Sequence, residues 1–296
     1  MLEFHPLTIA DRDAVQAVTL HAGRRNCNYT FSNLVGWHFW FHTEVCVLAK
    51  AVILRFNLNG KRAYMVCSAA ELPGTLIEAL LADNGGELTI IGLEDSQVTA
   101  LEIQNYEFKI EADPRRNQYD YIYRRADLAA LQGGLFKAKR NHVNRFCAEH
   151  PDFEYHALTP ELFDECRHIT SVWREEKEVS ETIDAERRVM ETVFTHWEEL
   201  EMLGGCIFVD GRMVAFTYGS AVTTDTFDVC VEKADRNIEG AFAIINQQFA
   251  EHIPEQYIYM NREEDMGLPG LRKAKLSYHP EILLTYNALH ITKNDR

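Results

Sequence analysis

The sequence predicts an α+β protein in which one helix–hairpin–helix–strand unit occurs twice. Its length of 296 residues fits about two domains, because a single domain averages roughly 150 residues. Each half contains a turn signal between strand-forming runs, Asn59-Gly60 in the first and Asp210-Gly211 in the second. Each half also has a strand that ends in an acid-rich turn, at 93–95 and at 261–265. These repeated features favour an internal duplication of a mixed central sheet flanked by helices.

The elements of the first half follow from local patterns. Thr8 and Asp11 are spaced as in a capping box, which predicts the start of a helix. Asn59-Gly60 tolerates positive φ and lies between two runs of β-formers, which predicts a hairpin. In order, we expect a helix from Thr8, a helix over 32–41, strands over 45–56 and 63–68, a helix over 73–81 that ends before Asn84-Gly85-Gly86, and a strand over 87–92.

The second half repeats this order at greater length. We expect helices over 138–149, 160–176 and 185–203, strands over 206–209, 213–218 and 226–232, a helix over 240–252 and a strand over 257–261. Aromatic residues at the start of a later expected strand also recur, at Tyr106-Glu-Phe108 and at Tyr278-His-Pro280. Gln132-Gly133-Gly134 interrupts the structured stretches, so we expect one domain over 1–130 and a second over 131–296.

Composition excludes several classes of protein. Forty-five acidic residues against thirty basic ones give a net charge of −15, which argues against general nucleic-acid binding. The seven cysteines are scattered and form no CxxC pair, so we expect neither a disulfide framework nor a zinc ribbon, and reduced thiols fit a cytoplasmic location. No apolar run approaches the roughly 20 residues of a membrane span, and no signal peptide is evident.

Motifs of common hydrolases and metalloenzymes are also missing. The sequence contains neither a GxSxG nor a GxxxxGK[ST] loop, which argues against serine hydrolases and nucleotide phosphatases. His38 and His42 are four residues apart, but the residues between them lack the glutamate of a zinc protease. We therefore expect no metal site.

The richest constellation of polar residues follows the strand over 257–261. Asn261 and Asp265 lie in a turn that leads through glycines into a helical segment, where backbone N–H groups can meet an anionic ligand. Arg262, Arg272 and Lys275 add positive charge, so they are candidates to bind a carrier phosphate. Asp265 is a candidate base or ligand for an acceptor ammonium group. The alternative is that Asp265 caps the helix and that the three basic side chains are solvated or paired.

A second basic cluster covers 137–145 and holds four Lys or Arg with no acid. A helix that presents Lys139, Arg140 and Asn144 could bind a phosphate or carboxylate of a substrate. It is also the one place where a tRNA acceptor end could contact this acidic chain. The alternative is an amphipathic helix with Val143 and Phe146 in the core and its charges in water.

The loop at 236–241 resembles the pyrophosphate loop of the Gcn5-related N-acetyltransferase superfamily, in which backbone N–H groups at a helix start bind coenzyme A. Arg236 and Ala241 match this loop, whereas Glu239 replaces its first glycine and Gly240 is displaced by one position. The segments around 121–123, 137–146 and 261–280 extend the likeness. They resemble a family of stand-alone bacterial proteins related to the C-terminal catalytic domain of phosphatidylglycerol lysyltransferase.

This resemblance implies two tandem Gcn5-related acyltransferase-like domains, as in Fem-type aminoacyltransferases. It implies transfer of an acyl or aminoacyl group, from acyl-coenzyme A or aminoacyl-tRNA, to a small amine or hydroxyl acceptor. By the same resemblance Glu232 is a base at a strand end and Tyr278 an acid near the leaving group, with Asp265 as a further catalytic candidate. Arg236, Gly240 and Ala241 would hold the carrier. In either case we expect the site in the second domain, facing the cleft between the two domains. The alternative to an enzyme is a non-catalytic module that binds an anionic metabolite in that cleft.

Overall fold

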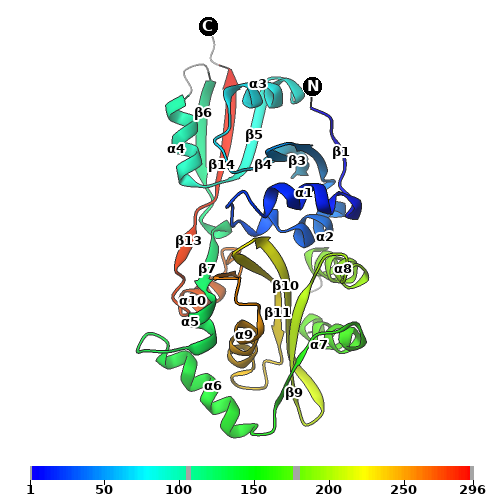
Figure 1. Ribbon diagram of the computed structural model, residues 1–296, viewed down its shortest axis with the longest axis vertical. Helices are drawn as coiled ribbons and strands as arrows, with labels where there is room; N and C mark the ends of the chain where they lie inside the picture. The colour runs from blue at the N-terminus through cyan, green and yellow to red at the C-terminus, as the bar shows by residue number, and fades with distance from the viewer. Residues whose placement is uncertain (1, 105–107, 176–180, 294–296) are drawn as a thin grey trace.

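The computed structural model describes residues 2–104, 108–175 and 181–293. Two seven-stranded mixed sheets and their flanking helices make up the molecule, and Figure 1 shows the two units one above the other. The first sheet has the order β1 (His5–Pro6), β2 (Glu44–Leu48), β3 (Ala51–Leu58), β4 (Lys61–Ser68), β5 (Glu87–Leu93), β14 (Asn287–Lys293) and β6 (Phe108–Pro114). The second has the order β13 (Ile282–Leu284), β7 (Asp120–Arg124), β12 (Tyr259–Asn261), β11 (Thr226–Ala234), β10 (Arg212–Thr223), β9 (Leu203–Val209) and β8 (Glu154–Ala157).

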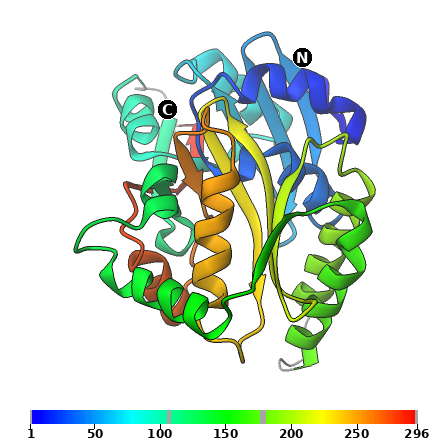
Figure 2. The same ribbon diagram turned by 60° about the horizontal axis from the view of Figure 1, so that its bottom comes forward.

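The α+β class is therefore confirmed, and the two mixed sheets agree with tandem Gcn5-related acyltransferase-like domains. The α-helices are α1 (Arg12–Thr19), α2 (Phe31–Phe41), α3 (Gly74–Asp83), α4 (Asp95–Gln104), α5 (Arg125–Ala130), α6 (Lys137–Glu149), α7 (Phe163–Glu175), α8 (Glu181–Thr195), α9 (Ala241–His252) and α10 (Pro269–Leu276). Figure 2 shows α9 on one face of the β9–β11 strands and α7 and α8 on the other. None of the helices in the described ranges is long and apolar enough to cross a bilayer.

The two sheets exchange strands. β14 comes from the end of the chain but lies between β5 and β6 of the first sheet. β7 precedes residue 130 but pairs with β12 and β13 of the second sheet. Sheet membership therefore does not change at residue 130, and the division into 1–130 and 131–296 stays a prediction. One hydrophobic core also joins the halves, since Val35 and Phe56 of the first share it with Val189 and Tyr218 of the second.

Most of the expected elements are present, and two are corrected. The hairpin at Asn59-Gly60 joins β3 to β4 as expected. The single strand expected over 45–56 is two strands, β2 and β3, because residues 49 and 50 form a turn inside a continuous run of β-formers. The helix expected over 185–203 ends at Thr195, and turns cover 196–201. Trp197 and Leu200 are buried at helical spacing, which made the pattern look longer than the helix. Tyr106, one of the aromatic residues expected at the start of a strand, lies outside the described residues.

The strands that frame the site diverge. β11 and β12 are parallel and pair only over 226–228 and 259–261, after which β11 continues alone beside β10. The register between β10 and β11 shifts at Cys230, because Tyr218 pairs with Val231 and Gly219 with Val229. Such bulges bend a strand and re-aim its side chains. Beyond these pairs the backbones of β11 and β12 part, and this split lies between Glu232 on β11 and Arg262, which follows β12.

The bulge depends on Gly219. A Cβ at this position would lie 1.7 Å from the backbone oxygen of Asp228, so any side chain would push the two strands apart. We expect Gly219→Ala to lower the free energy of unfolding by about 1–3 kcal/mol, as overpacking usually does. Gly134→Ala is the matched control, because no atom lies within 4 Å of its added Cβ. Urea denaturation measures both, and equal stability of the two variants would contradict this account of the bulge.

Candidate active site

A cavity of about 1000 Å³ lies between the two units. Its walls are largely apolar and come from both halves, including Trp37, Phe41, Leu54, Phe56, Met65 and Tyr286. Polar residues also line it, among them Cys230 and Glu232 of β11 and Glu263, Glu264 and Lys275 of the segment after β12. A volume of this size suits a small molecule rather than a macromolecule.

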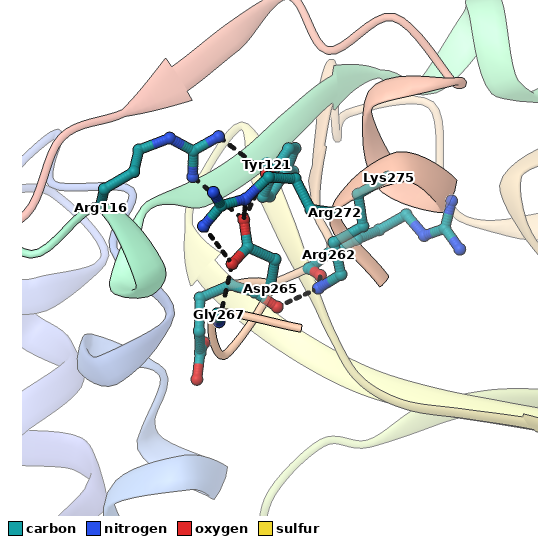
Figure 3. Close-up of polar contacts among 8 residues, drawn as sticks. Arg116, Tyr121, Arg262, Asp265, Gly267, Arg272 and Lys275 are labelled. Atoms are coloured by element: carbon teal, nitrogen blue, oxygen red, sulfur yellow. Dashed lines mark hydrogen bonds and ion pairs between the residues drawn. The ribbon is translucent and has the colours of Figure 1, made fainter. Parts of the chain in front are cut away.

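The loop after β12 is held by Asp265 (Figure 3). Arg272 contacts both carboxylate oxygens, with Nε 2.7 Å from Oδ2 and Nη2 2.9 Å from Oδ1. Arg116 Nη1 at 3.0 Å, the Tyr121 hydroxyl at 2.6 Å and the Gly267 N–H at 2.8 Å also donate to this carboxylate. Burial alone would raise the pKa of Asp265, but these donors hold it well below its usual value. Because both of its oxygens already accept hydrogen bonds, Asp265 holds the loop in position.

Lys275 fixes the same loop from α10. Its Nζ donates to the backbone carbonyls of Arg262 and Glu264, and it lines the cavity. Burial lowers the pKa of Lys275, while the nearby Glu263 carboxylate opposes that shift. Figure 3 shows the Arg262 side chain extending away from Asp265, on the far side of Lys275. The candidates Arg262, Arg272 and Lys275 therefore do not converge on one ligand position.

Four of the residues singled out from the sequence do meet at the split between β11 and β12. Arg262 Nη2 lies 2.7 Å from Glu232 Oε1, and its guanidinium carbon lies 4.7 Å from the centre of the Tyr278 ring. Lys139 Nζ of α6 lies 4.0 Å from the centre of the same ring. Asn246 of α9 donates to the other Glu232 oxygen at 3.3 Å. Arg262 Nη1 is buried and has no hydrogen-bond partner among the described residues.

The electrostatics of this cluster are unusual. Burial raises the pKa of Tyr278 to about 12, so its hydroxyl keeps its proton. Burial and then the neighbouring Arg262 charge lower the pKa of Lys139 to about 8. Two cationic side chains thus face a single carboxylate. Glu232 also lines the cavity, so this cluster lies next to the cavity.

The low pKa of Lys139 predicts a measurable dependence of stability on pH. Its pKa in the folded protein is about 8, whereas an unperturbed lysine titrates near about 10.4. Between these two pH values Lys139 holds its proton in the unfolded chain but not in the folded protein. Its contribution should therefore raise the free energy of unfolding as the pH rises from about 8 to about 10. NMR titration of the lysine side chains should show one midpoint near pH 8 that is absent in Lys139→Met. A full set of midpoints above 10 would contradict the environment described for Lys139.

A group of buried carboxyls, not predicted from the sequence, lies beside this cluster. Asn261, a candidate residue, donates to Asp120 Oδ2 at 2.8 Å and accepts the Glu263 N–H at 2.7 Å. Burial, and to a smaller extent the negative charge of Glu264, raises the pKa of Asp120 to about 6. Burial also raises the pKa values of Asp228 and Glu263 well above their usual range. These residues come from distant segments, so no local motif could indicate them.

The remaining candidates lie elsewhere. Gly240 has φ +85° and precedes α9, and a Cβ there would lie 2.7 Å from the His142 backbone oxygen of α6. Glu239 forms an ion pair with Arg145 of α6 at 2.6 Å, so α6 covers the start of α9 where Ala241 lies. None of Arg236, Gly240, Ala241, Arg140 and Asn144 is among the described residues that line the cavity. Arg140 donates to the backbone oxygens of Leu131 and Gly133, and Asn144 is exposed on α6.

The chain resembles a described protein family over most of its length. The model of the family described as phosphatidylglycerol lysyltransferase, C-terminal, matches residues 21–289. The chain belongs to this family. No curated protein matches the sequence. The family and the fold together indicate a function of the acyltransferase type.

Solved structures agree with the family. A conserved protein of unknown function from Bacteroides thetaiotaomicron is 39% identical, with a TM-score of 0.90 over 99% of this chain and 100% of that one. A C-terminal domain assigned to a lysylphosphatidylglycerol synthetase from Agrobacterium fabrum is 12% identical, with a TM-score of 0.66 over 94% and 92%. L-PGS from Bacillus licheniformis is 14% identical, with a TM-score of 0.61 over 97% and 92%. The last two show a shared fold only.

Proposed function

We propose that this member of the phosphatidylglycerol lysyltransferase C-terminal family moves an aminoacyl group from aminoacyl-tRNA to a small amine or hydroxyl acceptor in the cavity. The observation that carries the proposal is the position of Glu232 at the split between β11 and β12. Glu232 lines the cavity, and its carboxylate contacts Arg262 in the cluster that includes Lys139 and Tyr278. Two substrates that approach from opposite sides of the sheet would meet there.

The choice of donor rests on α6 and on the family. In a coenzyme A enzyme of this superfamily the pyrophosphate would occupy the start of α9, but here α6 packs against Gly240 and Glu239 adds a carboxylate at that place. The family is named for a lysyltransferase, which is an aminoacyl transfer. Lys139 of α6 reaches the split, where it would contact a phosphate of the donor. These observations favour an aminoacyl ester over an acyl thioester as donor.

The side chains at the split suit acyl transfer. Glu232 would take the proton from the acceptor nitrogen or oxygen as that atom attacks the ester carbonyl. The free N–H of Arg262 Nη1 would stabilise the negative charge that develops on the carbonyl oxygen. The ester bond to the ribose then breaks, and the proton held by Glu232 passes to the leaving ribose oxygen. In this proposal Asp265 positions the loop that carries Arg262 rather than acting as the base.

Ligand-dependent thermal unfolding tests the choice of donor, because a ligand that binds only the folded state raises its stability. We expect a non-hydrolysable aminoacyl-adenosine analogue to raise the melting temperature, and Lys139→Met to reduce the shift. Coenzyme A should leave the melting temperature unchanged. A shift with coenzyme A that disappears in Arg236→Ala would contradict the proposal and favour an acyl-coenzyme A donor. Stabilisation only by anionic metabolites would favour the non-catalytic module instead.

A further inference from the structure

A second group of polar side chains lies beside the cavity, and the transfer step does not use it. Asp228 and Cys230 lie on β11 around the bulge, and Glu263 lies in the loop after β12. One ligand atom from each of these residues lies within 4.8 Å of the others. Cys230 and Glu263 line the cavity, so the group is open to small solutes from that side.

Neighbouring side chains orient these three residues. Thr30 Oγ1 donates to Asp228 Oδ2 at 2.7 Å, and Asn33 Nδ2 lies 3.1 Å from that oxygen and 2.9 Å from Glu263 Oε1. Each of these donors comes from the first half of the chain. Hydrogen bonds of this kind hold the ligand side chains of metal sites in place. They occupy one oxygen of each carboxylate and leave the other available.

Two buried oxygen atoms at this site have no partner. Asp228 is fully buried, and its Oδ1 accepts no hydrogen bond from the described residues. The hydroxyl of Tyr218, a residue that is 1% exposed and also lines the cavity, has no partner in the same part of the chain. Tyr218 lies opposite Val231, next to the bulged Cys230. A buried polar atom without a partner is costly, so these atoms indicate a missing ligand.

The side chains of this group offer oxygen and sulfur ligands that suit a cation. Asp120, Asp228, Glu263 and Glu264 form no salt bridge within the described ranges. Lys275 is close, but its Nζ donates to backbone carbonyls instead. The thiol favours a transition-metal ion, because calcium and magnesium prefer oxygen ligands alone.

We propose that Asp228, Cys230 and Glu263 bind a divalent transition-metal ion of the Zn²⁺ class, with an open coordination position toward the cavity. Three protein ligands and one open position are the arrangement of reactive zinc sites. No motif in the sequence predicts this site, because its ligands come from separate segments of the chain. The neighbouring set of Cys27, Asp120 and Glu264 fits less well, because both oxygens of Asp120 already accept hydrogen bonds, Oδ1 from the Cys27 thiol at 3.3 Å and Oδ2 from the Cys27 N–H at 2.7 Å and from Asn261. Asp228 accepts through Oδ2 alone, including from the Cys230 thiol at 3.7 Å, among the described residues.

Titration of the metal-free protein with Co²⁺ tests the proposal independently of any transfer activity. A bound thiolate gives a charge-transfer absorption with Co²⁺, which we expect in the wild-type protein and not in Cys230→Ser. Two control variants should keep this absorption: Cys147→Ser, which replaces a half-buried cysteine of α6, and Cys27→Ser. Competition with a chelator should show that Glu263→Gln weakens Zn²⁺ binding at least about tenfold. Thermal unfolding of the metal-free variants shows whether each one is folded.

Three results would overturn the metal site. The first is a wild-type protein that gives no charge-transfer absorption and no stabilisation by Zn²⁺. The second is an absorption that survives in folded Cys230→Ser or disappears in Cys27→Ser, since either places the ion elsewhere. The third is stabilisation by a primary alkylamine, lost in Glu263→Gln, in a protein that Zn²⁺ does not stabilise. That result would identify the group as an ammonium site.

Discussion

Glu232→Gln is expected to lower the rate of aminoacyl transfer by about 100-fold or more, as loss of a general base usually does. Glutamine has nearly the same shape and can still accept a hydrogen bond from Arg262, which contacts Glu232 at 2.7 Å. It cannot take a proton from the acceptor. The fold should therefore remain while the chemical step is lost. Initial rates of product formation, measured beside the melting temperature, test this expectation.

The matched control for this variant is Glu239→Gln. Glu239 is a carboxylate of the same half, but it is paired with Arg145 at the surface of α6 and does not line the cavity. Its replacement should leave the transfer rate within about twofold, because exposed ion pairs contribute little. A Glu232→Gln protein with an undiminished rate would remove Glu232 from the chemical step. The proton would then have to pass to another group at the split.

Asp265→Ala should have the largest effect on stability. The carboxylate is fully buried and accepts hydrogen bonds from Arg272, Arg116, Tyr121 and the Gly267 backbone. Removal of one member of a buried, hydrogen-bonded ionic network typically costs about 3 kcal/mol or more. We expect a loss of that order in the free energy of unfolding, measured by urea denaturation. Transfer should fall as well, since the loop also carries Arg262.

Asp113→Ala provides the comparison for Asp265. Its salt bridge with Arg115 is 2.6 Å long, but both side chains are about half exposed. Water and salt screen such pairs, so this substitution should cost no more than about 1 kcal/mol. If the two aspartate variants were equally stable, the Asp265 network would not be what holds the loop. A rescue of stability by Asp265→Asn alone would show that shape and hydrogen bonding matter more than charge.

The sequence predicts local elements better than the connections between them. Turn signals and helical spacing identify the hairpin at Asn59-Gly60 and helix α9, because those patterns depend on neighbouring residues. No local pattern shows that β14 inserts between β5 and β6, since strand pairing is decided by tertiary packing. The end of α8 was missed because buried residues continue at helical spacing through a turn.

The candidate site shows the same limit. The segment over 261–280 was rich enough in polar residues to be singled out, and the structure places Arg262 and Tyr278 together with Glu232 and Lys139. Asp228 and Asn33 were missed. Each is a single polar residue in an ordinary strand or helix, and only the fold brings them to one place. Asp265 was found, but its saturated hydrogen bonds could not be read from spacing.

Direct observation of transfer tests the central claim. Mixed tRNA charged with labelled amino acids is incubated with the protein and a set of small amines and alcohols, and labelled products are identified by mass spectrometry. The account predicts a labelled amide or ester that forms with the wild-type protein and Glu239→Gln and is lost with Glu232→Gln. Product formed from acetyl-coenzyme A but not from charged tRNA would contradict it, as would labelled product that forms equally with Glu232→Gln.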